Sequence, residues 1–261
     1  MRWHLIVDER PRTGAENMAV DQALLERVQA GGRPSLRLYR WDPPCLSLGR
    51  NQAAPGPDVA TAAASRGIHV VRRPTGGMAV YHDREATYSV VVPVGVLGSP
   101  RETYRAINRA LVAGLARLGV PAEVAPERPG WMRRGAADWA APCFVAAAPG
   151  EVVVGGRKLV GSAQRAERRV LLQHGSLLLS GDQREAAELL GSSIHAASGV
   201  TCLEAVLGRV PSWDELVAAL REGFEEALGV RFEDDPCLAA LEDRARVLVD
   251  RFRSEEWTWR R

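Results

Sequence analysis

Lys158 is the residue whose type and position most directly suggest chemistry. It is the only lysine in a chain of 261 residues that carries 34 basic side chains. Lysine and arginine both form ion pairs in water, so a position that keeps the compact ammonium indicates a task that a planar guanidinium performs poorly, such as reaching one oxygen atom in a tight pocket. Chance survival of one lysine in a hairpin is the alternative, and composition alone leaves both interpretations open.

A second candidate is the segment RRPTGG, residues 72–77. Its adjacent glycines, Gly76 and Gly77, let the backbone approach a ligand closely, and Arg72 and Arg73 supply charge beside them. Such a loop suits a carboxylate, a phosphate or an acyl carbonyl. An ordinary glycine turn with two solvated arginines explains the same spacing, and from spacing alone it is the better explanation.

Composition excludes several classes of function. The 34 basic and 32 acidic residues give a net charge of +2, so no global field indicates a nucleic-acid or membrane partner. No run reaches the roughly 18 apolar residues of a membrane span, and the N-terminus lacks the long apolar run of a secretory signal. The four cysteines lie far apart, without the spacing of a zinc site. This pattern predicts free thiols, no metal and a cytoplasmic location.

The patterns that precede Lys158 predict strands that alternate with helices. Capping boxes at Thr13 and Ser99 begin two helices, because serine or threonine followed three residues later by glutamate satisfies two unpaired backbone amides. Strands are expected at 3–7, 35–40 and 45–49, with the last two paired to each other. Within 69–92, a strand, a loop at 74–77 and a second strand pair are expected. Residues 127–141 have no period and are expected to form a long loop, and such loops are often functional.

The patterns around and after Lys158 complete the expected fold. A tight turn at Gly155 and Gly156 leads into an antiparallel meander over residues 152–179, in which the strand that carries Lys158 is central. Further helix caps are expected at Asp182, Thr201 and Ser212. The economical interpretation is one α+β domain over residues 1–261, with a helical C-terminal part, about 181–261, packed on it.

Several segments resemble the lipoate and octanoate transferase and ligase superfamily, which shares its fold with the catalytic domain of biotin protein ligases. They are ENMAVDQALL (16–25), YRWDPPCLSLGRNQ (39–52), RRPTGGMAVYHD (72–83), and GGRKLVGSAQ (155–164) followed by LLQHGSLLL (171–179). They occur in the order typical of that superfamily and span most of the chain. The resemblance implies an α+β fold with a mixed, largely antiparallel sheet flanked by helices.

The resemblance also implies a site, in which the arginine and glycine loop walls a tunnel for a medium-chain acyl group above the lysine strand. The implied catalytic residues are Cys143 and Lys158. The implied substrate-binding residues are Arg72, Arg73, Gly76, Gly77, Met78, Ala79, His82, Gly161, Ser162 and Ala163. The other cysteines, Cys45, Cys202 and Cys237, are expected to be structural.

Three activities compete within the superfamily. ATP-dependent lipoate ligases typically show a third glycine where this chain has Met78 and a glycine-asparagine pair in the region of residues 84–87. The sequence HDREATYSV and the cysteine in PCF instead look like octanoyltransferases that take the acyl group from acyl carrier protein. Amidotransferases, which move it between lipoyl domains, are a third possibility, and a non-catalytic lipoyl-domain or carrier-binding protein is an alternative outside enzymology.

For the transferase, the resemblance implies a relay through Cys143. Two exchanges of similar leaving groups are easier than one difficult transfer to an amine. A free thiol has a pKa of about 8.5 and needs a neighbouring cation to become a thiolate at neutral pH, and Lys158 is the candidate. Its ammonium could also stabilise the oxyanion of the transition state. After the thioester forms, a deprotonated Lys158 could accept the proton of the incoming amine, which would require burial to lower its pKa from about 10.4.

The implied partners are octanoyl-acyl carrier protein as donor and a lipoyl domain, such as that of the glycine cleavage H protein, as acceptor. No cofactor, nucleic acid or membrane is expected. Because such carriers are commonly acidic, local arginines are expected to face them.

Overall fold

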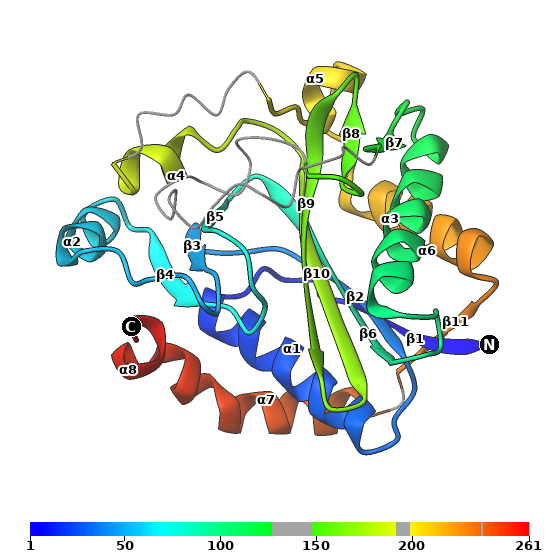
Figure 1. Ribbon diagram of the computed structural model, residues 1–261, viewed down its shortest axis with the longest axis horizontal. Helices are drawn as coiled ribbons and strands as arrows, with labels where there is room; N and C mark the ends of the chain where they lie inside the picture. Colours follow the sequence, from blue (N-terminus) through cyan, green and yellow to red (C-terminus); the bar gives the residue numbers. More distant parts are fainter. Residues whose placement is uncertain (127–147, 192–198, 236, 261) are drawn as a thin grey trace.

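The computed structural model describes residues 1–126, 148–191, 199–235 and 237–260 (Figure 1). The helices of this part are α1 (Gly14–Gln29), α2 (Pro57–Ser65), α3 (Pro100–Arg117), α4 (Arg184–Leu189), α5 (Leu203–Leu207), α6 (Trp213–Leu228), α7 (Leu238–Arg253) and α8 (Glu255–Thr258). The strands are β1 (Arg2–Val7), β2 (Ser35–Tyr39), β3 (Cys45–Leu48), β4 (His69–Arg72), β5 (Val80–His82), β6 (Glu85–Pro93), β7 (Glu123–Val124), β8 (Val152–Val154), β9 (Arg157–Glu167), β10 (Val170–Leu178) and β11 (Arg231–Asp234).

Within these residues the strands form two sheets. The larger has eight strands in the order β11-β1-β2-β6-β10-β9-β8-β7, and the smaller has the order β4-β3-β5. Strand β1 pairs in parallel with β2 and β11, whereas the pairs from β2 to β7 are antiparallel. The expected mixed, largely antiparallel α+β fold is therefore confirmed. The expected pairing of β2 with β3 is wrong, since the two strands belong to different sheets.

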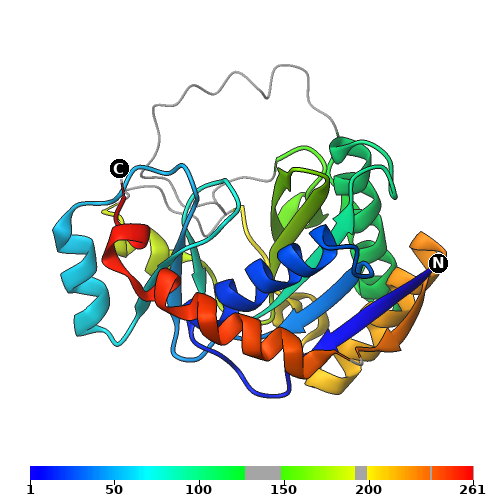
Figure 2. The same cartoon turned by 90° about the horizontal axis from the view of Figure 1, so that it is seen from below.

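Helices cover both faces of the large sheet (Figures 1 and 2). Successive side chains of a strand point to opposite faces, so Leu171 packs in the cluster that contains α3 and α6, and Leu172 packs in the cluster that contains α1 and α7. Helix α7 lies alongside α1 in Figure 2. Residues of α6 and α7 belong to these clusters, and the C-terminal part also contains strand β11, which the sequence patterns did not predict.

The strand that carries Lys158 is interior, as predicted. Strand β9 lies between β8 and β10, and the turn before it has positive φ at both Gly155 (54°) and Gly156 (74°), a conformation that favours glycine. The capping boxes predicted at Thr13 and Ser99 are both present. No helix in the described residues is long and apolar enough to cross a membrane.

Candidate active site

A narrow pocket lies where the two sheets face each other. The large sheet contributes residues of β2, β6, β9 and β10, the small sheet contributes residues of β3 and β5, and α1 contributes Met18. The lining residues are Met18, Tyr39, Trp41, Ser47, Arg73, Val80, His82, Thr87, Gly161, Ser162, Ala163, His174, Gly175 and Ser176. Its volume of about 30 Å³ suits one or two water molecules, so a longer apolar chain must displace side chains to enter. Met18, which is unbranched and flexible, is suited to such movement.

The structure brings five of the predicted substrate-binding residues together at this pocket. Arg73, His82, Gly161, Ser162 and Ala163 all line it.

The other predicted substrate-binding residues in the glycine loop lie beside the pocket rather than in its lining. Ala79 is fully buried in the core of the small sheet, and the carbonyl groups of Gly76 and Met78 accept hydrogen bonds from Arg73. Gly77 packs so closely against Gly49 that a Cβ on Gly49 would lie 1.8 Å from the Gly77 carbonyl oxygen. The loop is thus held tightly against the segment that follows β3.

Arg73 gives this loop its shape. Its guanidinium donates hydrogen bonds to the carbonyl oxygens of Ser47 (2.9 Å), Gly76 (2.7 Å) and Met78 (2.7 Å), and to Ser47 Oγ (3.2 Å). These acceptors belong to β3 and to both sides of the turn. Only a planar group with several N–H donors can reach these acceptors together, which explains the arginine at this position.

The side chain of Arg72 does not line the pocket. Its side chain donates hydrogen bonds to the carbonyl oxygens of Gly49 and Gln52 (both 2.6 Å) and of Thr258 (2.9 Å) in α8. Trp257 Nε1 donates in return to the Arg72 carbonyl oxygen (2.9 Å). Arg72 therefore ties the C-terminal helix to the loop after β3. Trp257, one of two tryptophans near the C-terminus, has a structural role in this contact.

His82 is buried in a chain of hydrogen bonds on the pocket wall. Its Nε2 lies 2.8 Å from Ser47 Oγ and its Nδ1 lies 3.3 Å from Glu85 Oε1. Trp41 stacks on the imidazole, with 4.0 Å between ring centroids. Burial lowers the pKa of His82, and the positive charge of Arg73 acts in the same direction, although Glu85 opposes them. The neutral ring donates at Nδ1 to Glu85 and accepts at Nε2 from Ser47.

Acid should destabilise the fold partly through His82. The pKa of His82 in the folded chain lies below the ordinary value of about 6.5, so the unfolded chain binds a proton at this histidine more readily. The free energy of unfolding therefore decreases as the pH falls below about 6.5. We expect His82→Gln to reduce the loss of unfolding free energy between about pH 7 and pH 5, as measured by urea denaturation. The exposed His69→Gln is the control. Equal losses in His82→Gln and the parent would contradict the assignment.

A second buried chain of polar contacts was not predicted. His174, on the pocket wall, places Nδ1 3.0 Å from Asp21 Oδ2 and Nε2 against the hydroxyl of Thr75 in the glycine loop. Asp21 also accepts hydrogen bonds from Arg37 (2.9 Å) and from the Tyr39 hydroxyl (3.0 Å). These hydrogen bonds connect the glycine loop to the core beside the large sheet.

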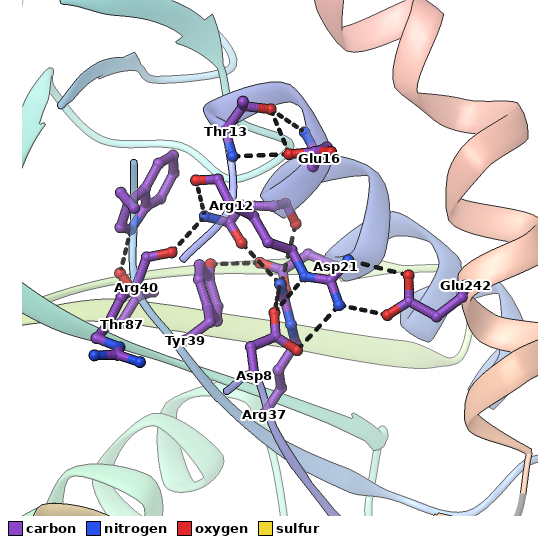
Figure 3. Close-up of polar contacts among 12 residues, drawn as sticks. Asp8, Arg12, Thr13, Glu16, Asp21, Arg37, Tyr39, Arg40, Thr87 and Glu242 are labelled. Carbon is purple, nitrogen blue, oxygen red and sulfur yellow. Dashed lines mark hydrogen bonds and ion pairs between the residues drawn. The ribbon is translucent and has the colours of Figure 1, made fainter. Parts of the chain in front are cut away.

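Behind Asp21 the polar contacts continue to Glu242 of α7 (Figure 3). Arg37 donates to Asp8 (2.6 Å), and Asp8 also accepts from Arg12 (2.7 Å). Arg12 in turn donates to Glu242 of α7 (3.0 Å). Burial alone would raise the pKa of Asp8, but the charges and hydrogen bonds of Arg37 and Arg12 outweigh it and hold that pKa below its usual range. A sequence signal did exist, because Asn17 and Asp21 lie four residues apart on the buried face of α1.

Lys158 is nearly inaccessible, with 1% of its surface exposed. Its Nζ forms an ion pair of 2.7 Å with Oε1 of Glu151, which is 3% exposed. Lys158 lies three residues before Gly161 on the strand that lines the pocket. Cys143, the predicted nucleophile, lies outside the described residues. Glu151 was not predicted, since a single glutamate before a valine run carries no distinctive spacing.

The sequence is similar to one family of known proteins over most of its length. Residues 13–225 match the sequence model of the lipoyl protein ligase A/B catalytic domain. An octanoyltransferase LipM from Kyrpidia tusciae is 42% identical over 95% of this chain and 96% of its own length. Another, from Symbiobacterium thermophilum, is 38% identical over 99% and 98%.

Solved structures show the same fold. A lipoate-protein ligase A bound with ATP is 27% identical and superposes with a TM-score of 0.80 over 99% of both chains. Protein Ta0514 of T. acidophilum, with bound lipoic acid, is also 27% identical, with a TM-score of 0.76 over 99% of both chains. The pocket between two sheets, the arginine and glycine loop beside it and the buried lysine on β9 thus lie on a common scaffold, and the chain belongs to the lipoyl protein ligase A/B catalytic domain family.

Proposed function

We propose that the chain is an octanoyltransferase that moves an octanoyl group from a thioester of acyl carrier protein to a lysine of a lipoyl domain, through a thioester on Cys143. The observation that carries this proposal is similarity to LipM octanoyltransferases at 34–42% identity over almost the whole chain. The proposal places the reaction in the cytoplasm. Free thiols at Cys45, Cys202 and Cys237 are consistent with a reducing compartment.

In the first step the Cys143 thiolate attacks the carbonyl carbon of the carrier thioester. The bond from this carbon to the carrier sulfur breaks, and the carrier thiolate leaves and takes a proton from the Lys158 ammonium. Before that transfer, the ammonium donates to the carbonyl oxygen, where negative charge develops. The octanoyl tail occupies the pocket between the two sheets, and Met18 moves to admit it.

In the second step the acceptor amine attacks the Cys143 thioester. The carbon–nitrogen bond forms, the Cys143 thiolate leaves, and the amine proton returns to Lys158. The enzyme ends in its starting state, and the net change is one thioester exchanged for one amide. No ATP is required, because the energy of the donor thioester drives amide formation.

The test is a transfer assay with a lipoyl domain as acceptor and three donors: octanoyl-acyl carrier protein without ATP, an octanoylated lipoyl domain without ATP, and free octanoate with ATP. The proposal predicts a mass increase of the acceptor only with the first donor. Transfer only from the second would indicate an amidotransferase. Transfer only from the third would indicate a ligase, the activity named for the solved structure with ATP.

A further inference from the structure

We propose that Glu151 is a positioning residue, which holds Lys158 protonated and aimed at the reacting carbonyl. This inference rests on the proposed function and adds to it the group that sets the charge of the lysine. In the resting enzyme Lys158 is then an ammonium and not a neutral amine.

Lys158 and Glu151 form a close ion pair that is buried. Both side chains are almost fully buried, at 1% for Lys158 and 3% for Glu151, and their charged atoms are 2.7 Å apart. A buried charge without a partner is costly, and a carboxylate at this distance favours the protonated amine. Removal of the carboxylate charge should therefore make the ammonium lose its proton at a lower pH.

The backbone of Lys158 is fixed independently of Glu151. Its N–H donates to the Gly199 carbonyl (2.8 Å), and its carbonyl accepts from the Thr201 N–H (3.0 Å). A register shift between Val152 and Val153 interrupts the ladder of β8 with β9, and such irregularities re-aim side chains. With the backbone held in place, the glutamate acts on the direction and charge of the side chain alone.

Glu151 also connects Lys158 to the residues that follow position 147. Its second oxygen, Oε2, accepts a hydrogen bond from the Ala148 N–H (2.7 Å), and its own N–H donates to the Ala148 carbonyl (3.1 Å). This turn lies five residues after Cys143 in the sequence. One carboxylate thus contacts the proposed oxyanion donor and the chain that leads from the proposed nucleophile.

Two neighbouring groups that the structure describes, on β6 and α3, are neutral. On β6, the pKa of Tyr88 is raised, first by burial and also by the charge of Glu151, so the phenol stays neutral. Its hydroxyl bonds Ser162 Oγ (2.7 Å). From α3, the neutral Asn108 donates to the Gly150 carbonyl (2.6 Å), and the ring of Tyr104 lies beside Gly150.

In the reaction sequence, Glu151 is neither acylated nor consumed. Lys158 gives its proton to the carrier thiolate and regains one from the acceptor amine, while Glu151 stays a carboxylate. Its charge favours recovery of the ammonium, so each new cycle begins with a donor for the carbonyl oxygen.

Glu151→Gln separates this role from a purely structural one. Glutamine has the same size and keeps an oxygen that can accept from the Ala148 N–H, so it removes the charge with little change in packing. The matched control is Glu123→Gln on β7, where the side chain is exposed.

The direct readout is NMR of protein grown with lysine labelled with ¹³C at Cε and purified without a lysine-containing tag. Because the chain has one lysine, one signal reports the protonation of Lys158 without further assignment. We expect the midpoint of its titration to fall by about one pH unit or more in Glu151→Gln and to stay unchanged in Glu123→Gln. The same midpoint in Glu151→Gln and the parent would overturn the proposal. Failure of Glu151→Gln to fold would also overturn it, since that would indicate a structural role.

A kinetic readout connects this titration to catalysis. We expect Glu151→Gln to slow octanoylation of the enzyme by about tenfold or more at neutral pH, with a shifted pH profile and little change in KM, and Glu151→Asp to recover part of the rate. An unshifted profile would count against the proposal. The NMR experiment needs no substrate, so it distinguishes an error about Glu151 from an error about the reaction.

Discussion

Lys158→Arg should lower the rate of octanoyl transfer by roughly a hundredfold or more, although the positive charge remains. Removal of one oxyanion donor typically costs about 3 kcal/mol of transition-state stabilisation. The arginine fork is wider than an ammonium and matches a carboxylate with two bonds, so it should remain on Glu151, which contacts Lys158 at 2.7 Å. The carbonyl oxygen of the acyl group then loses its donor.

The measurement is the single-turnover rate of enzyme acylation, with folding checked by circular dichroism. Arg157→Lys is the matched control, because it makes the reverse exchange at the neighbouring, exposed position of the same strand. We expect its rate to equal that of the parent. A Lys158→Arg enzyme with nearly normal turnover would show that the compact ammonium is not needed, and it would remove the main argument for this residue.

Arg37→Met should have the largest effect on stability, with a loss of about 3–5 kcal/mol in the free energy of unfolding. Arg37 is fully buried and donates to both Asp8 (2.6 Å) and Asp21 (2.9 Å), whose pKa values it helps to lower against the effect of burial. Methionine fills similar space and leaves these carboxylates with fewer partners. Because Asp21 also holds His174 against Thr75, the glycine loop should loosen as well.

Urea denaturation at neutral pH measures this loss, and Arg33→Met is its control. Arg33 also forms an ion pair, with Glu233 at 2.6 Å, but half of its side chain is exposed. Exposed pairs contribute at most about 1 kcal/mol, so the control should lose little. Similar losses of unfolding free energy in the two variants would show that the buried contacts of Arg37 with Asp8 and Asp21 do not contribute more than an exposed ion pair.

Local signals in the sequence predicted much of the fold. The capping residues Thr13, Ser99 and Ser212 each accept the expected backbone hydrogen bond, because a cap is determined by residues within one turn. Two other caps were wrong, and the helices begin after Gln183 and Cys202 instead of Asp182 and Thr201. The N–H of Thr201 instead donates to the Lys158 carbonyl in β9, which continues the pairing of this segment with the strand by one residue before the helix.

Contacts between distant segments were harder to predict. Strands β2 and β3 have similar local patterns, and nothing within either strand specifies that they join different sheets. Strand β11 buries Phe232 but only part of the rest, so its alternation is too short to detect. Arg72 and Arg73 are neighbours in the sequence, yet one anchors α8 and the other shapes the glycine loop.

For the site, the family resemblance indicated Arg73, His82 and residues 161–163, which line the pocket. It did not indicate the ion pair of Glu151 with Lys158 or the contact of Asp21 with His174. The fold brings each of these pairs together, and no fixed motif spacing reveals them in the sequence. The catalytic roles of Cys143 and Lys158 remain predictions.

The most direct test of the central proposal is the intact mass of the protein after mixing with octanoyl-acyl carrier protein in the absence of ATP and acceptor. We predict that the parent gains one octanoyl group that hydroxylamine removes, and that Cys143→Ala gains none. A group that resists neutral hydroxylamine would be an amide or an oxygen ester and would contradict a thioester relay. Equal labelling of Cys143→Ala and the parent would contradict the assignment of Cys143.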